Sequence, residues 1–165
     1  MNDSTKFRVL ILKFYNNKCP ITNENKIIKL QDFHIISDNN VNQIISLKMY
    51  NNTFNGMLMK KDLYENEFLT FKFTFDYKNY TIINNMFVNI GIIVQPNQSS
   101  SLEINKYKYK KIKIPYKTLY FIRHHYLCFL KKHDLSINES FDMTINDIIN
   151  GNLIDNCGDI IMLIN

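Results

Sequence analysis

The sequence predicts a mainly β protein: a small antiparallel barrel or sandwich with one or two helices in the C-terminal third, formed by residues 1–165 as a single domain. Short apolar runs bounded by polar turns fill the first two thirds of the chain, whereas helical spacing of apolar residues begins only after Pro115. Hydrophobic residues make up 45% of the 165 residues, enough for a core without disulfide or metal staples. A five-stranded Greek-key barrel of the oligonucleotide-binding type is one option within this class.

Several apolar runs in the N-terminal part are predicted strands. Residues 7–15 are nearly all apolar, which is typical of a strand buried on both faces. Residues 26–30 and 33–36 are shorter runs of the same kind. Residues 43–50 and 54–60 flank a polar turn, so we expect a hairpin there.

The clearest strand signal spans residues 69–77, where apolar and polar side chains alternate with a period of two. The face that we expect to be buried carries three phenylalanines, Phe71, Phe73 and Phe75. Lys72 and Thr74 lie between them and are expected to be exposed. Such an aromatic row is more typical of a core than of a platform for base stacking.

Two further predicted strands contain an irregularity. Residues 86–94 form an apolar run that Gly91 interrupts, which indicates a bulge. Residues 106–114 alternate between polar and apolar side chains with a slip at Lys110 and Lys111, which is also typical of a β-bulge.

The last third of the chain changes to helical spacing. Residues 116–132 are predicted to form a helix, because apolar residues recur there every three or four positions. These apolar residues are Leu119, Ile122, Tyr126 and Phe129. Ser136 and Glu139 have the spacing of a capping box before a second helical face at 141–149, and residues 160–164 are a predicted strand.

The composition indicates an AT-rich genome, such as that of many insect viruses, cytoplasmic plasmids and some protists. The chain has no Ala and only four Gly and three Pro, whereas Asn, Ile and Lys, which AT-rich codons encode, are abundant. No signal-peptide core and no apolar run of membrane-spanning length is found, so we expect an intracellular, cytoplasmic rather than nuclear protein with no membrane association. The three cysteines are expected to be reduced thiols.

Charge is strongly segregated along the chain, although the net charge is only +5. Residues 106–133 carry nine Lys and Arg and no acidic residue, whereas residues 134–165 carry six Asp and Glu and no Lys or Arg. The basic residues of this stretch, with the two tyrosines among its first lysines, form the candidate nucleic-acid-binding set. Its members are Lys106, Tyr107, Lys108, Tyr109, Lys110, Lys111, Lys113, Lys117, Arg123, Lys131 and Lys132.

Three interpretations of this set are open. Lysines at alternate positions of a strand lie on one face about 7 Å apart, which suits the phosphates of an extended nucleic-acid strand, while tyrosines beside them stack on bases. Lysines also protect an edge strand against aggregation, and in this second interpretation the acidic segment 134–165 pairs with them inside the fold. The third interpretation is that the basic strand binds an acidic protein partner.

Residues with catalytic or metal-binding chemistry form no recognisable motif. The single metal-like cluster is His124, His125, Cys128 and His133, with Cys157 as a candidate further ligand, but the second ligand motif that zinc sites usually have is missing. No glycine-rich phosphate loop or local nucleophile motif is found. The sequence therefore predicts no metal, no cofactor and no catalytic residue.

The sequence thus predicts a non-enzymatic nucleic-acid-binding accessory protein that prefers single strands. The alternative is a protein-interaction or structural protein of a virus or plasmid with an AT-rich genome, whose basic strand binds an acidic partner or guards a sheet edge. The pattern gives no signal for an oligomeric state, or for DNA over RNA.

Overall fold

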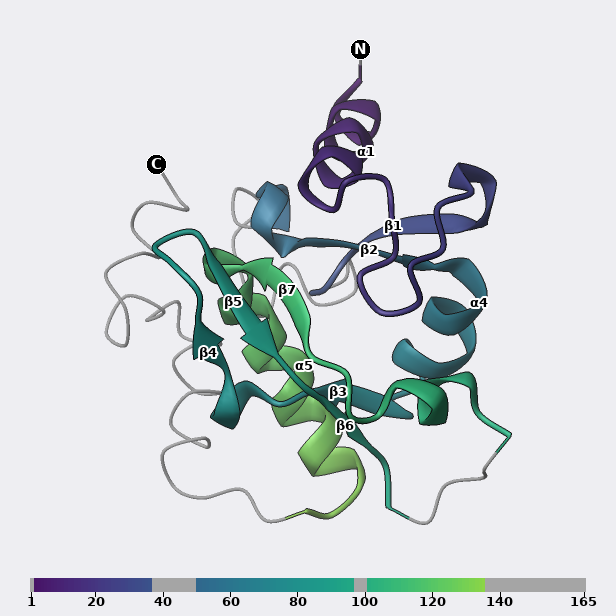
Figure 1. Ribbon diagram of the computed structural model, residues 1–165, viewed down its shortest axis with the longest axis vertical. Helices are drawn as coiled ribbons and strands as arrows, with labels where there is room; N and C mark the ends of the chain where they lie inside the picture. Colours follow the sequence, from purple (N-terminus) through teal and green to yellow (C-terminus); the bar gives the residue numbers. More distant parts are fainter. Residues whose placement is uncertain (1, 37–49, 97–100, 136–165) are drawn as a thin grey trace.

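A computed structural model describes residues 2–36, 50–96 and 101–135 of the chain (Figure 1). Its labelled helices are α1 (Asp3–Phe14), α4 (Lys61–Leu63) and α5 (Leu119–Lys132), and α4 continues as a π-helical turn at Tyr64–Phe68. The strands are β1 (Leu30–His34), β2 (Gly56–Lys60), β3 (Phe73–Phe75), β4 (Thr81–Ile82), β5 (Phe87–Ile90), β6 (Ile92–Val94) and β7 (Ile112–Pro115). Short 3-10 helices lie at Ile27–Lys29, Thr53–Asn55, Tyr77–Asn79, Glu103–Tyr107 and Tyr116–Thr118.

The strands pair antiparallel, as predicted, but they form separate small sheets. β1 pairs with β2, β3 pairs with β6, and β5 lies between β4 and β7. Among the described residues no closed barrel is found and about 44% are helical, so the mainly β prediction is confirmed only in part. Sheets of two or three strands are too narrow to close on themselves, and helices pack against them instead, α1 on β2 and α5 on β3 (Figure 1).

The strand predicted at residues 7–15 is wrong, because α1 includes most of them. The Asn2 side chain accepts a hydrogen bond from a backbone amide of the first turn at 2.8 Å, the geometry that starts a helix. Phe7 and Ile11 lie one turn apart and are buried, whereas Val9 is 50% exposed. An apolar run with little polar contrast does not reveal its period, so the pattern alone did not separate helix from buried strand.

α1 packs closely on β2 because position 56 has no side chain. A Cβ atom at Gly56 would lie 2.3 Å from Ile11 Cδ1 and 2.6 Å from Phe7 Cζ. Carbon atoms pack best at about 3.5–4.0 Å, so a side chain at position 56 fits only if the ends of the Ile11 and Phe7 side chains shift. The ends of these two side chains therefore rest directly on the backbone of β2.

β2 pairs with β1, and the predicted partner strand at 43–50 lies almost wholly outside the described residues.

The buried side chain of Asn55, just before β2, links two segments of the chain. Its Oδ1 accepts a hydrogen bond from the Ile36 amide at 2.9 Å, and its Nδ2 donates to the Tyr50 carbonyl at 3.0 Å. An amide side chain that is satisfied on both sides fixes the end of this sheet.

Only the centre of the predicted strand 69–77 is extended, as β3. Phe71 has a φ of 59°, a left-handed conformation that is uncommon for a bulky residue, and it breaks the period of two. The two phenylalanines of β3 are fully buried, as predicted, whereas Phe71 and Lys72 are half-buried. The expectation that Thr74 is exposed is wrong, because β3 packs against α5 and Thr74 is fully buried.

The buried Thr74 hydroxyl is hydrogen bonded to His125 on α5. Thr74 Oγ1 lies 2.8 Å from His125 Nδ1, and His125 Nε2 lies 3.1 Å from the Phe68 carbonyl oxygen. Because a carbonyl oxygen can only accept, Nε2 carries the proton and Nδ1 accepts from the threonine. Burial lowers the pKa of His125 to about 3, so the imidazole is neutral.

The helix predicted at residues 116–132 is confirmed by α5 and the 3-10 helix before it. Gly91 separates β5 from β6 within the predicted run 86–94. The predicted strand 106–114 is wrong for its first part, because β7 begins only at Ile112. The elements predicted after residue 135 lie outside the described residues.

We expect Gly56→Ala to lower the free energy of unfolding by about 1–3 kcal/mol, the usual cost of overpacking a core. The matched control is Gly91→Ala, because a Cβ atom at Gly91 meets nothing within 4 Å. Gly91→Ala should be neutral or raise stability by about 0.4–1 kcal/mol, since alanine restricts the unfolded chain. Urea unfolding of both variants measures the difference, and equal stabilities would contradict the close contact of α1 with β2.

We expect acid to destabilise the protein through His125. Its pKa is about 3 in the folded protein against an ordinary value of 6.5, so between these pH values the unfolded chain binds more protons than the folded one. The free energy of unfolding therefore falls as the pH is lowered from 6.5 towards 3, by up to about 1.4 kcal/mol per pH unit.

Urea unfolding at a series of pH values should show a shallower slope for His125→Gln than for the wild type. Thr74→Val is the control, because it removes the hydroxyl but keeps the buried imidazole, so its stability should be lower at every pH with the slope retained. A His125→Gln slope equal to that of the wild type would contradict the buried neutral histidine.

Candidate nucleic-acid interface

The candidate residues begin on the 3-10 helix Glu103–Tyr107, whose N-terminus is held by the buried side chain of Glu67. The Glu67 carboxylate accepts hydrogen bonds from the backbone amides of Glu103, at 3.1 Å, and Ile104, at 2.9 Å. Glu67 is 5% exposed and lies in the π-helical turn after α4. A carboxylate at this place satisfies amides that have no partner within their own helix.

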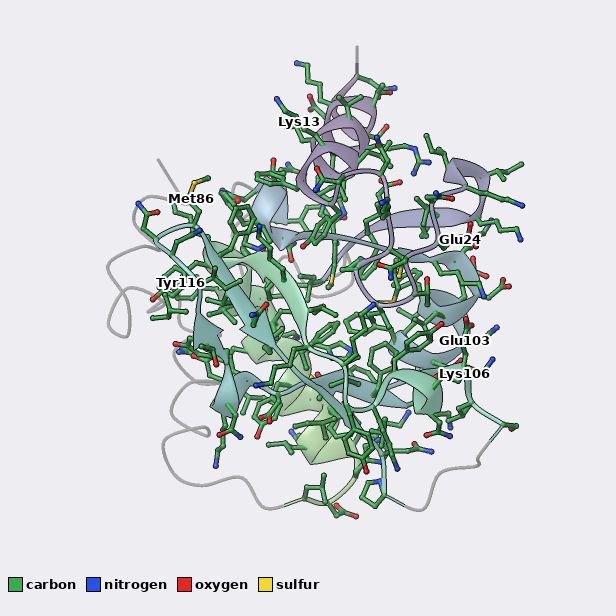
Figure 2. The ribbon with its side chains drawn as sticks, viewed as in Figure 1. Lys13, Glu24, Met86, Glu103, Lys106 and Tyr116 are labelled. Carbon is green, nitrogen blue, oxygen red and sulfur yellow. The ribbon has the colours of Figure 1, made fainter. Side chains whose placement is uncertain are left out.

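The chain then forms an exposed segment at residues 106–111, which we call the basic turn. Tyr107 is half-buried against the core, and its carbonyl accepts a hydrogen bond from the Lys110 amide at 2.8 Å. Three lysines of the basic turn are exposed: Lys106, Lys108 and Lys111. Figure 2 shows Lys106 beside Glu103 at the edge of the molecule.

Side chains of the basic turn differ in their contacts. The Tyr109 ring is 88% exposed, and the Lys108 ammonium lies 5.2 Å from its centroid, a cation–π distance. The Lys110 ammonium instead donates to the Ile21 carbonyl at 2.6 Å. Lys110 therefore attaches the basic turn to the loop after α1, whereas Lys108 and Tyr109 face solvent.

Further along the chain, two candidate lysines lie over aromatic rings. Lys113, on β7, is exposed with its ammonium 4.3 Å from the centroid of the Phe87 ring. Lys117 is half-buried with its ammonium 5.5 Å from the Phe54 centroid. Their stems cover apolar rings while each charge stays near the surface.

The candidates on α5 are partly engaged with the rest of the fold. Arg123 Nε donates to the Tyr77 hydroxyl at 2.7 Å, and Lys132 Nζ donates to the Thr70 carbonyl at 2.9 Å. Lys131, in the last turn of the helix, is exposed.

The candidate set thus lies on several elements, and the single row along one strand that the alternation predicted is wrong. The Lys106 and Tyr116 side chains lie on opposite sides of Figure 2, and Lys117 directly follows Tyr116. The structure brings six candidates together in the basic turn and separates them from those on α5. The alternation of lysines was misleading because such a sequence pattern also occurs in a 3-10 helix followed by a turn, and not only in a strand.

In residues 2–36, 50–96 and 101–135, no candidate Lys or Arg forms a salt bridge with Asp or Glu. The salt bridges in those segments join Arg8 to Asp32 and Lys60 to Glu103. The acidic segment 134–165 lies outside the described residues apart from its first two positions. Its pairing with the basic residues stays a prediction.

The metal-like cluster does not converge in the part of the chain that the structure describes. His124 Nε2 lies 3.6 Å from Cys128 Sγ one turn further along α5, but His125 and His133 are hydrogen bonded to other protein groups. No group of three or more His, Cys, Asp or Glu there could hold a metal ion. Cys157 lies outside the described residues.

The His124–Cys128 pair is not poised for nucleophilic chemistry. Burial lowers the pKa of His124 to about 4 and raises the pKa of the Cys128 thiol. Both shifts favour the neutral pair over a thiolate beside an imidazolium, which is the form that attacks substrates. Cys19 and Cys128 are free cysteines, as predicted.

Sequence reasoning missed Glu67, the residue that holds the basic turn in place. Its position before an apparent strand gives it the look of a loop residue. Its carboxylate accepts hydrogen bonds from two amides that lie 36 and 37 residues further along the chain. No local sequence pattern reports contacts at that separation. The same holds for Lys110, whose partner Ile21 is 89 residues away.

Comparisons with known proteins add no family to this description. No protein-family model matches the chain, no curated protein matches its sequence, and no solved structure matches its fold. Within the described residues, none of the helices has both the length and the apolar character needed to cross a membrane.

Proposed function

We propose that the protein is a non-enzymatic nucleic-acid-binding accessory protein that prefers single strands and makes contact through the basic turn. The observation that carries this proposal is the Tyr109 ring, which is 88% exposed among the lysines of that turn. An exposed aromatic ring costs free energy in water and offers a flat face to an unpaired base.

The charges around Tyr109 support the same interpretation. Lys106, Lys108 and Lys111 are exposed, and none of them forms a salt bridge within the described residues. Lysine ammonium groups bind phosphates as point charges and release counterions from the strand. Bases stacked in a duplex do not present a free face to a protruding ring, so a lone tyrosine among lysines favours single strands.

The support beneath the basic turn also suits a binding surface. Glu67 fixes the start of the 3-10 helix, and the Lys110 ammonium fixes the turn to the Ile21 carbonyl. Side chains on a held backbone lose less entropy on binding than those on a free loop.

The alternative, a protein-interaction or structural protein of a virus or plasmid, has one observation in its favour. β7 is an edge strand of the sheet β4–β5–β7 within the described residues. Its exposed Lys113 lies where a lysine would prevent the strand from pairing with another chain. In this alternative the basic surface binds an acidic protein, or only protects the sheet edge, and does not bind a nucleic acid.

Fluorescence anisotropy with a labelled single-stranded oligonucleotide, across a salt series, tests the proposal. We expect Lys108→Glu with Lys111→Glu to weaken binding and to reduce the log–log salt slope by about 1.4, because each phosphate contact on a single strand contributes about 0.7. Lys6→Glu with Lys29→Glu makes the same change of charge at two exposed positions outside the candidate set and should have a much smaller effect.

Stacking on Tyr109 has its own test in the same assay. Tyr109→Ala should weaken binding by about 1–3 kcal/mol, the usual contribution of a stacked base, whereas Tyr109→Phe keeps the ring and should bind like the wild type. Thermal melting of each variant checks that the fold is intact.

Two results would overturn the proposal. One is equal loss of binding in the two Lys-to-Glu double variants, which would show a general charge effect. The other is no binding at low salt, and binding of an acidic polypeptide such as polyglutamate would then favour the alternative.

A further inference from the structure

A cavity of about 470 Å³ lies between α1, the loop after it and the sheet formed by β4, β5 and β7. Leu10 and Phe14 of α1 form one apolar wall, and Met86 and Phe87 form the other. Figure 2 shows Met86 at the end of the hairpin between β4 and β5, on the left, and Lys13 on α1, at the top; both residues line the cavity. This volume lies within the range of small-molecule sites, about 300–1,000 Å³.

One residue in each apolar wall is exposed. Met86 is 61% exposed and Leu10 is 43% exposed. Four apolar residues belong to one face of α1, because positions 7, 10, 11 and 14 have helical spacing. Phe7 and Ile11 pack on β2, whereas Leu10 and Phe14 beside them line the cavity. Leu10 is thus the part of this apolar face that stays exposed, at the edge of the cavity.

Two lysines give the cavity its charge. Lys13 and Lys113 both line it, and none of the described lining residues is acidic. Neither lysine forms a salt bridge in the part of the chain that the structure describes. Lys113 is held with its ammonium 4.3 Å above the centroid of the Phe87 ring, so its charge lies beside an apolar wall.

We propose that this cavity binds a small amphipathic anion, an aromatic or aliphatic body with one carboxylate or sulfonate group. The body contacts Leu10, Phe14 and Met86, where burying the exposed apolar surface provides the affinity. The anionic group lies near Lys13 and Lys113, which provide the selectivity for negative charge. This site shares Lys113 with the candidate nucleic-acid-binding set, but none of its lining residues belongs to the basic turn, so the two proposals can fail separately.

A pair of fluorescent probes separates the two contributions on the full chain. Anilinonaphthalene sulfonate carries the anionic group, and N-phenyl-1-naphthylamine is the matched probe without it. We expect both probes to bind the wild type. Decanoate, an anion, should displace anilinonaphthalene sulfonate, whereas decyltrimethylammonium, a cation of the same chain length, should not. Lys13→Met with Lys113→Met should weaken the sulfonate at least tenfold and leave the neutral probe unchanged.

Two further variants locate the site. Leu10→Trp places a large side chain in the cavity at an exposed position, so it should abolish binding of both probes and leave oligonucleotide binding unchanged. Lys6→Met with Lys29→Met removes two exposed charges outside the cavity and should leave both probes bound as in the wild type. A cooperative thermal melt of every variant excludes probe binding to an unfolded core.

The proposal is overturned if Leu10→Trp binds both probes like the wild type, since the probes then bind elsewhere. Equal weakening of the sulfonate by the two Lys-to-Met double variants would overturn the charge selectivity. Displacement of the sulfonate by a mononucleotide but not by decanoate would overturn the ligand class. If Leu10→Trp loses oligonucleotide binding as well as both probes, with a normal thermal melt, the result would count against the proposed interface and not against the cavity.

Discussion

The neutral imidazole of His125 joins three parts of the fold, and much of the described structure depends on it. One ring nitrogen accepts from Thr74 on β3, the other donates to the Phe68 carbonyl after α4, and the ring belongs to α5. The Phe68 ring stacks on it with the centroids 3.8 Å apart. A buried polar group satisfied on both sides selects one arrangement of its neighbours, because any other leaves it unpaired.

This arrangement extends to the candidate interface through adjacent residues. Phe68 accepts from His125, and its neighbour Glu67 accepts from the amides of Glu103 and Ile104. The basic turn thus connects to α5 through a short series of buried hydrogen bonds. Protonation of the imidazole replaces an acceptor with a second donor, so acid acts on the support of the basic turn as well as on the core.

Sequence patterns predicted elements whose signal is local and failed where a distant contact decides. The helix at α5 was predictable because apolar residues recur along one face, and so was the break at Gly91. α1 was mistaken for a strand because apolar residues such as the exposed Val9 also lie outside its packing face, so the run shows no clear helical period. The buried state of Thr74 depends on α5, about 50 residues further on, which no alternation of neighbours can report.

The basic candidates show the same division. Segregation of charge along the chain was visible in the sequence, since it needs only counting. The sequence did not reveal which lysines reach solvent. Lys108 and Lys110 are two positions apart and look equivalent, but only the Lys110 ammonium donates a hydrogen bond to the Ile21 carbonyl. The contacts of Lys110 and Glu67 are set by tertiary packing, so the anchor of the basic turn could not be found from spacing.

The absence of a side chain at position 56 links that position to positions 7 and 11 in evolution. The chain has only four glycines. A side chain at position 56 would need space that both the Ile11 and the Phe7 side chains fill. Among divergent relatives that keep α1 on β2, a larger residue at position 56 would be accompanied by smaller ones at positions 7 and 11, whereas position 91 would vary freely.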